Sequence, residues 1–194
     1  MTRTQVANTY PALDPVRFLF QRGGMADSSP LQLLPSDPLI DDRATAAAVA
    51  RGIARLFARN GIWCLAEMPL RNGRRADLMG VDDKGRIVIV EIKVARGDLL
   101  GDGKWPDYLE FCDRFYWGVP PGLDRSPLDG DGYRPDCCGV IVADSYDAEI
   151  LRPAPLHPLA AARRKCEIER LARTALRRLT VASDPYCAPW GTES

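Results

Sequence analysis

Three short strand-like runs with a turn signal between neighbours constrain the fold of this 194-residue chain most strongly. The runs span residues 62–70, 75–81 and 86–94, and they are separated by an Asn-Gly pair at 72–73 and a polar segment at 82–85. Asn-Gly between apolar runs is typical of a two-residue hairpin turn, and the second separator indicates a four-residue loop. The pattern therefore predicts an antiparallel meander of three strands.

The segments on either side of the meander predict helices and further strands. Helices are expected from residue 41 or 42 to the Asn-Gly pair at 60–61, from residue 105 or 106 to 114, and over residues 159–179, and strands over residues 115–119, 138–143 and 149–151. The last of these strands is short and is expected at an edge. This order of elements predicts a mixed α/β sandwich built around one sheet.

The composition and the positions of Pro and Gly divide the chain into one folded domain and two terminal segments. Residues 41–182 are expected to form the domain, because 194 residues with 46% apolar content suit a single packed core. Residues 1–40 carry many Pro and Gly residues without sustained periodicity, so they are expected to form a flexible arm. Residues 183–194 are expected to form a C-terminal tail.

The cysteines and the apolar runs bear on where the protein works. The chain has six Cys, shows no signal-peptide pattern, and contains no apolar run near the roughly 20 residues that span a bilayer. A cytoplasmic location with reduced thiols and no membrane partner is therefore expected. None of the cysteines stands in a CxxC pair, which disfavours a structural zinc site.

The distribution of charge is more informative than its sum. The chain has 26 basic and 26 acidic residues, yet residues 152–180 hold eight Lys or Arg against two Glu. A local basic face on a neutral chain fits phosphate binding. A solvated helix face fits the same pattern equally well, so the basic segment alone does not decide between them.

Glu91 and Lys93 are the sharpest candidates for chemistry. They directly follow the apolar run Ile-Val-Ile-Val at 87–90, which is typical of a strand buried on both faces. A charge taken out of water is unfavourable unless it is paired or bound to a metal. The two residues are two positions apart in a strand and therefore share one face. Asp77 supplies a second carboxylate from the preceding run, within reach across the meander.

Two carboxylates and a lysine at one sheet edge suit a divalent cation and a phosphodiester. Mg²⁺ or Mn²⁺ is the expected cofactor, with Asp77 and Glu91 as ligands and the main-chain carbonyl of Ile92 completing the shell. Lys93 is expected to position the attacking water or to stabilise negative charge in the transition state. For a Glu-x-Lys sequence alone, a surface ion pair at a strand end is the simpler interpretation.

This site depends on the register of the meander. With a two-residue turn at 72–73 and a four-residue loop at 82–85, Asp77 faces Val90 and Glu91 lies on the opposite side. We therefore predict an odd-length loop, or a bulge near Asp77, that brings the two carboxylates together. Straight pairing in that register would exclude the two-carboxylate site.

Glu67, in the first strand-like run, is a third acid candidate. It could serve as a further metal ligand or orient a metal-bound water. The same two-residue turn places it opposite Leu78 and on the wrong face, unless Pro69 breaks the pairing. Its membership of the site stays open at this point.

These residues resemble a known family. Asp77 followed by Glu91 and Lys93 resembles the PD-(D/E)XK nuclease signature, with Ala76 in the place of its proline. An ordered set of motifs over about residues 42–180 is similar to the MmcB family of bacterial DNA-repair proteins, at residues 72–77, 91–93, 104–108, 112–113, 139–144 and 158–165. The resemblance implies a restriction-endonuclease-like fold and a role in DNA repair, and it implies no particular substrate.

Two groups of residues are candidates for contact with DNA. Lys104 and Tyr108 follow the meander, where related folds often use a polar residue to grip phosphate, although core packing explains Tyr108 equally well. Arg163, Arg164 and Lys165 begin the basic helix, where neutralised phosphates would make binding salt-dependent. No base-reading motif is visible, so recognition of backbone or DNA shape is expected.

Two functions from different classes remain. The first is a Mg²⁺- or Mn²⁺-dependent deoxyribonuclease that hydrolyses phosphodiester bonds in DNA repair. The second is a non-catalytic module that binds DNA or a protein partner on a nuclease-like scaffold. DNA is the expected partner in either case, while contacts with other repair proteins and a homodimer are left open.

Overall fold

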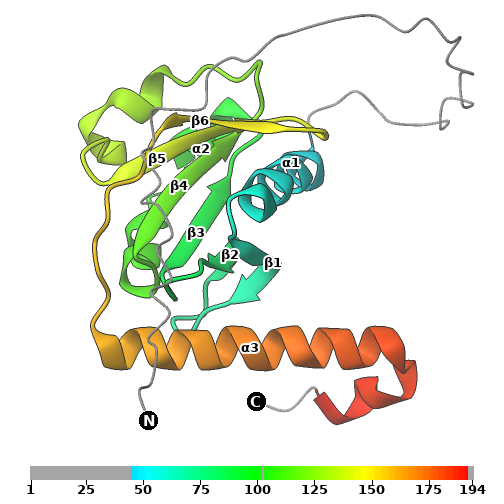
Figure 1. Ribbon diagram of the computed structural model, residues 1–194. Coiled ribbons are helices and arrows are strands. Elements are labelled where there is room, and N and C mark those ends of the chain that lie inside the picture. The colour runs from blue at the N-terminus through cyan, green and yellow to red at the C-terminus, as the bar shows by residue number, and fades with distance from the viewer. Residues whose placement is uncertain (1–44, 102, 192–194) are drawn as a thin grey trace, which may run out of the picture. The chain divides into compact units, whose positions relative to one another are not determined.

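The computed structural model describes residues 45–101 and 103–191 of the chain (Figure 1). The N-terminal arm expected over residues 1–40 lies outside the described residues, as does the expected start of the first helix. The helices, strands and 3-10 helices (η) follow in this order: α1 (Ala46–Arg59), β1 (Trp63–Pro69), β2 (Arg75–Val81), β3 (Ile87–Ile92), α2 (Arg96–Gly101), η1 (Trp105–Phe111), β4 (Arg114–Val119), η2 (Ser126–Asp129), η3 (Asp131–Tyr133), β5 (Cys138–Ala143), β6 (Ala148–Arg152), α3 (Ala161–Ser183) and η4 (Pro185–Gly191).

The six strands form one sheet whose spatial order is the order along the chain. β1, β2 and β3 pair antiparallel, β3, β4 and β5 pair parallel, and β6 returns antiparallel to β5 at the far edge. Every residue of β3 is buried, as expected of a strand that is covered on both faces. The predicted three-strand meander and the mixed α/β architecture are therefore confirmed.

α1 covers one face of the sheet (Figure 1). Val49, Ile53 and Phe57 on its inner side are almost inaccessible and belong to one apolar cluster with side chains of the sheet. Gly52 allows a close approach, because a Cβ at this position would lie 2.3 Å from the main-chain oxygen of Asp144. The helix is thereby packed tightly against the turn between β5 and β6.

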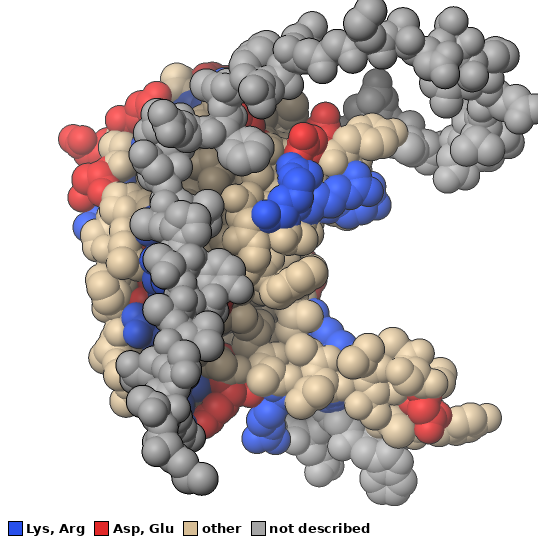
Figure 2. Space-filling view, viewed as in Figure 1, with Lys and Arg blue, Asp and Glu red and all other residues tan. Residues whose placement is uncertain are grey.

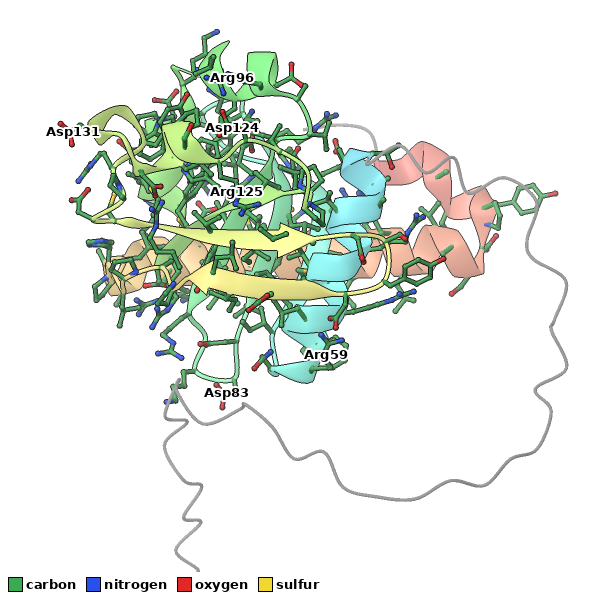
Figure 3. The ribbon with its side chains drawn as sticks, turned by 90° about the horizontal axis from the view of Figure 1, so that it is seen from above. Arg59, Asp83, Arg96, Asp124, Arg125 and Asp131 are labelled. Carbon is green, nitrogen blue, oxygen red and sulfur yellow. The ribbon has the colours of Figure 1, made fainter. Side chains whose placement is uncertain are left out.

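The opposite face is covered by η1, the loop that contains η2 and η3, and α3. Trp105 of η1 packs on Phe115 and Trp117 of β4, with ring centroids 5.2–5.7 Å apart among the three residues. Arg96 of α2 forms an ion pair with Asp124 in the loop after β4, and the two lie close together in Figure 3. The sheet is thus enclosed between two layers, as the element order predicted.

Four elements differ from the predictions. The segment expected as a helix over 105–114 is the 3-10 helix η1, because Trp105, Tyr108 and Phe111 are buried at every third position. The short helix α2 was not predicted. α3 continues past the expected end at residue 179, and η4 follows it in the segment expected as a tail.

Both loops of the meander have three residues. A main-chain hydrogen bond of 2.7 Å closes the first loop around residues 71–73, and one of 3.0 Å closes the second around residues 83–85. The last residue of each loop, Gly73 or Gly85, has a φ of 78° or 71°, as in a type I turn followed by a left-handed residue. The two-residue turn expected at 72–73 is wrong, and the odd-length second loop that the site requires is confirmed.

Candidate active site

The second loop sets Asp77 and Glu91 side by side. The paired residues of β2 and β3 end with Leu78 beside Val90. The next residues outward are Asp77 and Glu91, which therefore lie at the same level on neighbouring strands. The four-residue loop would have turned Glu91 to the other face.

The Asp77 carboxylate reaches the main chain of β3. Its Oδ2 accepts a hydrogen bond of 2.7 Å from the amide of Ile92. Because the β2–β3 ladder has already ended at Leu78, the side chain takes the place of a main-chain acceptor. The carboxylate is consequently held against the peptide group that joins Glu91 to Ile92.

Glu91 and Lys93 form a buried ion pair at the end of β3. Lys93 Nζ lies 3.2 Å from Glu91 Oε1, and the two side chains are only 12% and 9% exposed. The amide of Lys93 donates to the main-chain oxygen of Gly118 at 2.9 Å, which anchors this end of β3 to β4. The positive charge of Lys93 offsets the negative charge of Glu91 away from water, which lowers the free-energy cost of burying either group.

The environment of Asp77 raises the pKa of its carboxyl group. Burial is the main cause, and the negative charge of Glu67 adds to it. The Ile92 amide and the charges of Lys93 and Arg75 act in the opposite direction without cancelling the effect. The carboxylate is thus less stable here than in water, and a bound cation would relieve that penalty.

Replacing Asp77 by Asn is expected to stabilise the metal-free protein. Asn keeps an acceptor for the Ile92 amide and removes the desolvated charge, so the melting temperature at pH 7 should rise by about 2–4 °C. Because the folded-state pKa of Asp77 is raised, wild type should lose stability relative to the variant as pH rises through that pKa, and the difference should vanish at low pH. Added Mn²⁺ should raise the melting temperature of wild type alone. Equal stability of the two proteins at every pH would contradict this account.

Glu67 lies closer to the site than the sequence suggested. The β1–β2 pairs on either side of Glu67 place it level with Asp77, not with Leu78 as expected. Its φ of 54° interrupts the pairing at this residue, and its carboxylate, half exposed, forms an ion pair with Arg75. A third acid therefore borders the site, with Arg75 as its counter-ion.

Two arginines of α3 hold β1 at this irregular residue. Arg178 donates to the main-chain oxygens of Ala66 and Glu67, the latter at 2.8 Å, and Arg170 donates to that of Pro69. These bonds satisfy carbonyl groups of the edge strand and favour a left-handed conformation that residues other than glycine rarely adopt. The basic helix thus has a structural contact with the strand that carries the third acid.

The donor set fits a hard divalent cation. Asp77 and Glu91 offer carboxylate oxygens, and the carbonyl of Ile92 belongs to the next peptide group along β3. Mg²⁺ prefers such oxygen ligands, usually keeps several waters, and is commonly held by one or two carboxylates together with phosphate oxygens of the substrate. Within residues 45–101 and 103–191, no group of three or more His, Cys, Asp and Glu side chains is arranged to hold a metal ion.

Of the two residues after the meander that were expected to contact DNA, one is in the core. Tyr108 is 7% exposed, stacks on Phe115 with centroids 6.0 Å apart, and donates its hydroxyl to the main-chain oxygen of Arg75 at 3.2 Å. Through this hydroxyl it supports β2 two residues before Asp77, and its contact with DNA stays a prediction. Lys104 is exposed at the start of η1.

The basic residues at the start of α3 have different surroundings. Arg164 donates hydrogen bonds to the buried carboxylate of Asp113, which draws its guanidinium group toward the interior. Arg163 lies over the ring of Phe111, 5.4 Å from its centroid, and Lys165 is exposed and 3.9 Å from Glu169. Of the three, Arg163 and Lys165 stay accessible to a phosphate.

Asp113 is the structurally important acid that the sequence did not single out. It is fully buried between η1 and β4, and it accepts bonds from the amides of Ile87 and Leu159, at 2.7 and 2.8 Å, besides those from Arg164. One side chain therefore joins β3, the segment after β6 and α3. Nothing in its sequence neighbourhood, apart from the motif at 112–113, marks it as a buried anchor.

None of the helices in the described part of the chain is long and apolar enough to cross a membrane.

A solved protein of unknown function from Silicibacter pomeroyi is 39% identical to this chain. The match covers 77% of this chain and 95% of that protein, and the two structures superimpose with a TM-score of 0.65. A repair endonuclease from Pyrococcus abyssi is 21% identical over 49% of this chain and 46% of its own, but its TM-score of 0.30 does not establish a common fold.

None of the curated proteins compared with the chain matches it. The family described as DNA repair protein MmcB-like matches residues 35–186, which include the whole sheet, the acidic site and α3. A match of this extent leaves only the first 34 residues and the last eight outside it. The chain belongs to the MmcB-like family of DNA repair proteins.

Proposed function

We propose that the protein is a Mg²⁺- or Mn²⁺-dependent deoxyribonuclease that acts in DNA repair. The observation that carries the proposal is the hydrogen bond from the Ile92 amide to Asp77, which holds one carboxylate against the strand that bears Glu91 and Lys93. Membership of a DNA repair family supports DNA as the substrate.

Each residue of the site has a defined part in this proposal. A divalent cation bound by Asp77 and Glu91 would polarise a phosphoryl oxygen of the substrate and lower the pKa of a water molecule. Lys93, fixed by Glu91 and by the anchoring of its amide to β4, places a positive charge where negative charge grows during phosphodiester cleavage. Glu67 would accept a proton or a water hydrogen if Arg75 released its carboxylate.

One observation favours the alternative of a non-catalytic binding module. The Glu67 carboxylate is neutralised by Arg75, so the acids left for a cation are Asp77 and Glu91. A site with two acidic ligands binds a cation weakly unless DNA phosphate contributes a further oxygen. The alternative would retain DNA binding and lack metal-dependent cleavage.

Cleavage assays with defined DNA distinguish the two functions. Labelled single-stranded, duplex and branched DNA would be incubated with the protein and Mg²⁺, Mn²⁺ or chelator, beside Glu91→Gln. The proposal expects products only with a metal ion, none with chelator, and loss of metal-induced thermal stabilisation in Glu91→Gln. Glu149→Gln, an exposed acid on β6, is the matched control and should behave as wild type.

Retention of DNA binding without cleavage of any of these substrates would favour the binding module. Cleavage that persists in chelator would point to a metal-independent reaction and overturn the assignment of Asp77 and Glu91 as ligands.

A further inference from the structure

One ion pair joins the third acid of the site to an arginine. Glu67 of β1 and Arg75 of β2 form this pair, with side chains that are 51% and 65% exposed. The β1–β2 register places Glu67 level with Asp77 and Arg75 opposite Pro69. Burial is the main cause of the raised pKa of Asp77, and the charges of Glu67 and Arg75 act on that pKa in opposite directions. The ion pair therefore lies within electrostatic range of a proposed metal ligand.

Glu67 can reach two different partners from one main-chain position. Directly opposed residues of antiparallel strands have Cβ atoms about 4.5–5.5 Å apart, a distance that a glutamate side chain can span. Arg178 of α3 donates to the carbonyl groups of Ala66 and Glu67 and thereby holds the left-handed main chain of Glu67 in place. The side chain can thus leave Arg75 and turn toward a cation at Asp77 without any movement of the strand.

The formal charges of the site favour a cation and a phosphate together. The site contains three acidic and two basic side chains, a formal sum of −1: Glu67, Asp77, Glu91, Arg75 and Lys93. A divalent cation alone changes this sum to +1. A phosphodiester group of DNA carries one negative charge and returns the sum to zero. The site is therefore neutral when it holds both ligands.

We propose that a DNA phosphate displaces Glu67 from Arg75 and so releases a third carboxylate to the cation site. This inference deepens the proposed nuclease function and rests on it for the reaction. In the free protein Arg75 neutralises Glu67. When Arg75 binds a phosphodiester group, Glu67 adds its negative charge to those of Asp77 and Glu91. DNA and the metal ion thereby strengthen each other's binding.

A phosphate is a suitable competitor for Arg75. A guanidinium group is always charged and can bind two phosphate oxygens through parallel hydrogen bonds. An ion pair between exposed side chains contributes less than about fivefold to an equilibrium constant, so it is readily exchanged. Glu91 and Lys93, by contrast, are paired away from water, with side chains 9% and 12% exposed, and separating them costs more. The exposed pair is therefore the one that DNA can separate.

Other basic side chains also attract DNA, so total affinity does not identify the contact at Arg75. Figure 2 shows that Lys and Arg side chains gather over α1, and Lys165 of α3 is exposed. A double-mutant cycle of Glu67 and Arg75 isolates the part of the binding free energy that depends on both residues, because the contributions of distant residues cancel.

Manganese binding without DNA provides the first cycle. The Mn²⁺ affinities of wild type, Glu67→Gln, Arg75→Gln and the double variant would be measured by calorimetry. Arg75→Gln should bind Mn²⁺ about tenfold more tightly than wild type, because Glu67 is released and one positive charge is removed. In the Glu67→Gln background the same change should increase the affinity only about twofold, through the charge alone.

DNA binding in chelator provides the second cycle. The affinities of the same four proteins for a fluorescein-labelled 15-nucleotide single strand and for its duplex would be followed by fluorescence anisotropy. Glu67→Gln should bind the more tightly held of the two DNAs about fivefold better than wild type, because Arg75 becomes available to phosphate. In the Arg75→Gln background, Glu67→Gln should change the affinity by less than about twofold.

Two variants control for charge as such. Arg74→Gln removes the same charge from the neighbouring residue, which is paired with Asp107, and should leave the Mn²⁺ affinity within about twofold of wild type. Arg75→Lys keeps an ion pair with Glu67 and should bind Mn²⁺ as wild type does. Because the side chains of Glu67 and Arg75 are more than half exposed, all these variants are expected to fold.

Additive effects of the two substitutions would overturn the inference, because charges that act independently have no coupling free energy. Coupling in only one of the two cycles would overturn it as well, since the exchange at Arg75 must affect both ligands. Neither cycle depends on cleavage. A protein that shows both couplings but never cuts DNA would refute the nuclease and leave the exchange in place, whereas cleavage with additive cycles would refute the exchange alone.

Discussion

Lys93→Ala is expected to reduce metal-dependent DNA cleavage by about 100- to 1,000-fold, the usual effect of removing one group that stabilises transition-state charge. The lysine side chain is 12% exposed and lies 3.2 Å from Glu91, so its charge acts in surroundings with little water. Its loss would remove the positive charge that the proposed reaction places beside the scissile phosphate, and it would leave both carboxylates in place. The rate at saturating metal and DNA would be measured with wild type in parallel.

The same variant separates a catalytic lysine from a structural one. Because Lys93 repels a cation, Lys93→Ala should bind Mn²⁺ at least as tightly as wild type, which calorimetry can measure. Lys93→Arg keeps the charge and should recover part of the activity. Lys84→Ala, in the exposed second loop of the meander, is the matched control and should cleave as wild type. Reduced metal affinity in Lys93→Ala together with a lower melting temperature would indicate a structural role.

The strand meander could be predicted from the sequence, but the length of its loops could not. An Asn-Gly pair suits a two-residue turn, and it equally suits the end of a three-residue loop in which Gly73 is left-handed. Contacts distant in the sequence decide between them: Asn72 and Arg74 bind Asp107 of η1. In the second loop, Asp82 accepts bonds from the amides of residues 84 and 86.

Each loop differs in length from its prediction by one residue, and this difference determines which acidic residues lie opposite each other on neighbouring strands. In the predicted register, Asp77 and Glu91 would have been on opposite faces, and Glu67 would have faced Leu78. The prediction that the two carboxylates lie on neighbouring strands at the same level agrees with the observed register, and it came from the requirement that buried charge at the end of an apolar strand has a partner. The demand for an odd-length loop came from that chemistry and not from turn propensity.

The exposed residues of the edge strand and of α3 show where prediction from the sequence ends. Trp63 begins a predicted strand, and an aromatic residue at that position is ordinary for a sheet. Only the placement of β1 at the edge, between α1 and α3, leaves its ring in solvent. Likewise, the row of arginines in α3 could be counted in the sequence, but the division between those that bind β1 and those that face solvent depends on how the helix is packed.

Asp113→Asn is expected to lower the free energy of unfolding at pH 7 by about 3 kcal/mol, equivalent to about 6–12 °C in melting temperature. The wild-type carboxylate is fully buried and accepts bonds from Arg164 and from the amides of Ile87 and Leu159. Asn cannot accept all of them and leaves the guanidinium without its counter-ion. Urea unfolding of both proteins would measure the loss, with Asp129→Asn, an exposed partner of Arg152, expected to cost less than about 1 kcal/mol.

The pH dependence of this difference tests its electrostatic origin. Burial alone would raise the pKa of Asp113, but the bonds from Arg164, Ile87 and Leu159 outweigh it and the pKa is lowered. A lowered folded-state pKa gives stability that is complete above the unfolded value of about 3.9 and is lost as pH falls through the folded value. The gap between wild type and Asp113→Asn should therefore stay constant from pH 7 to about 5 and shrink in stronger acid. A gap that persists unchanged at pH 2 would show that packing, and not the carboxylate charge, fixes α3 to the sheet.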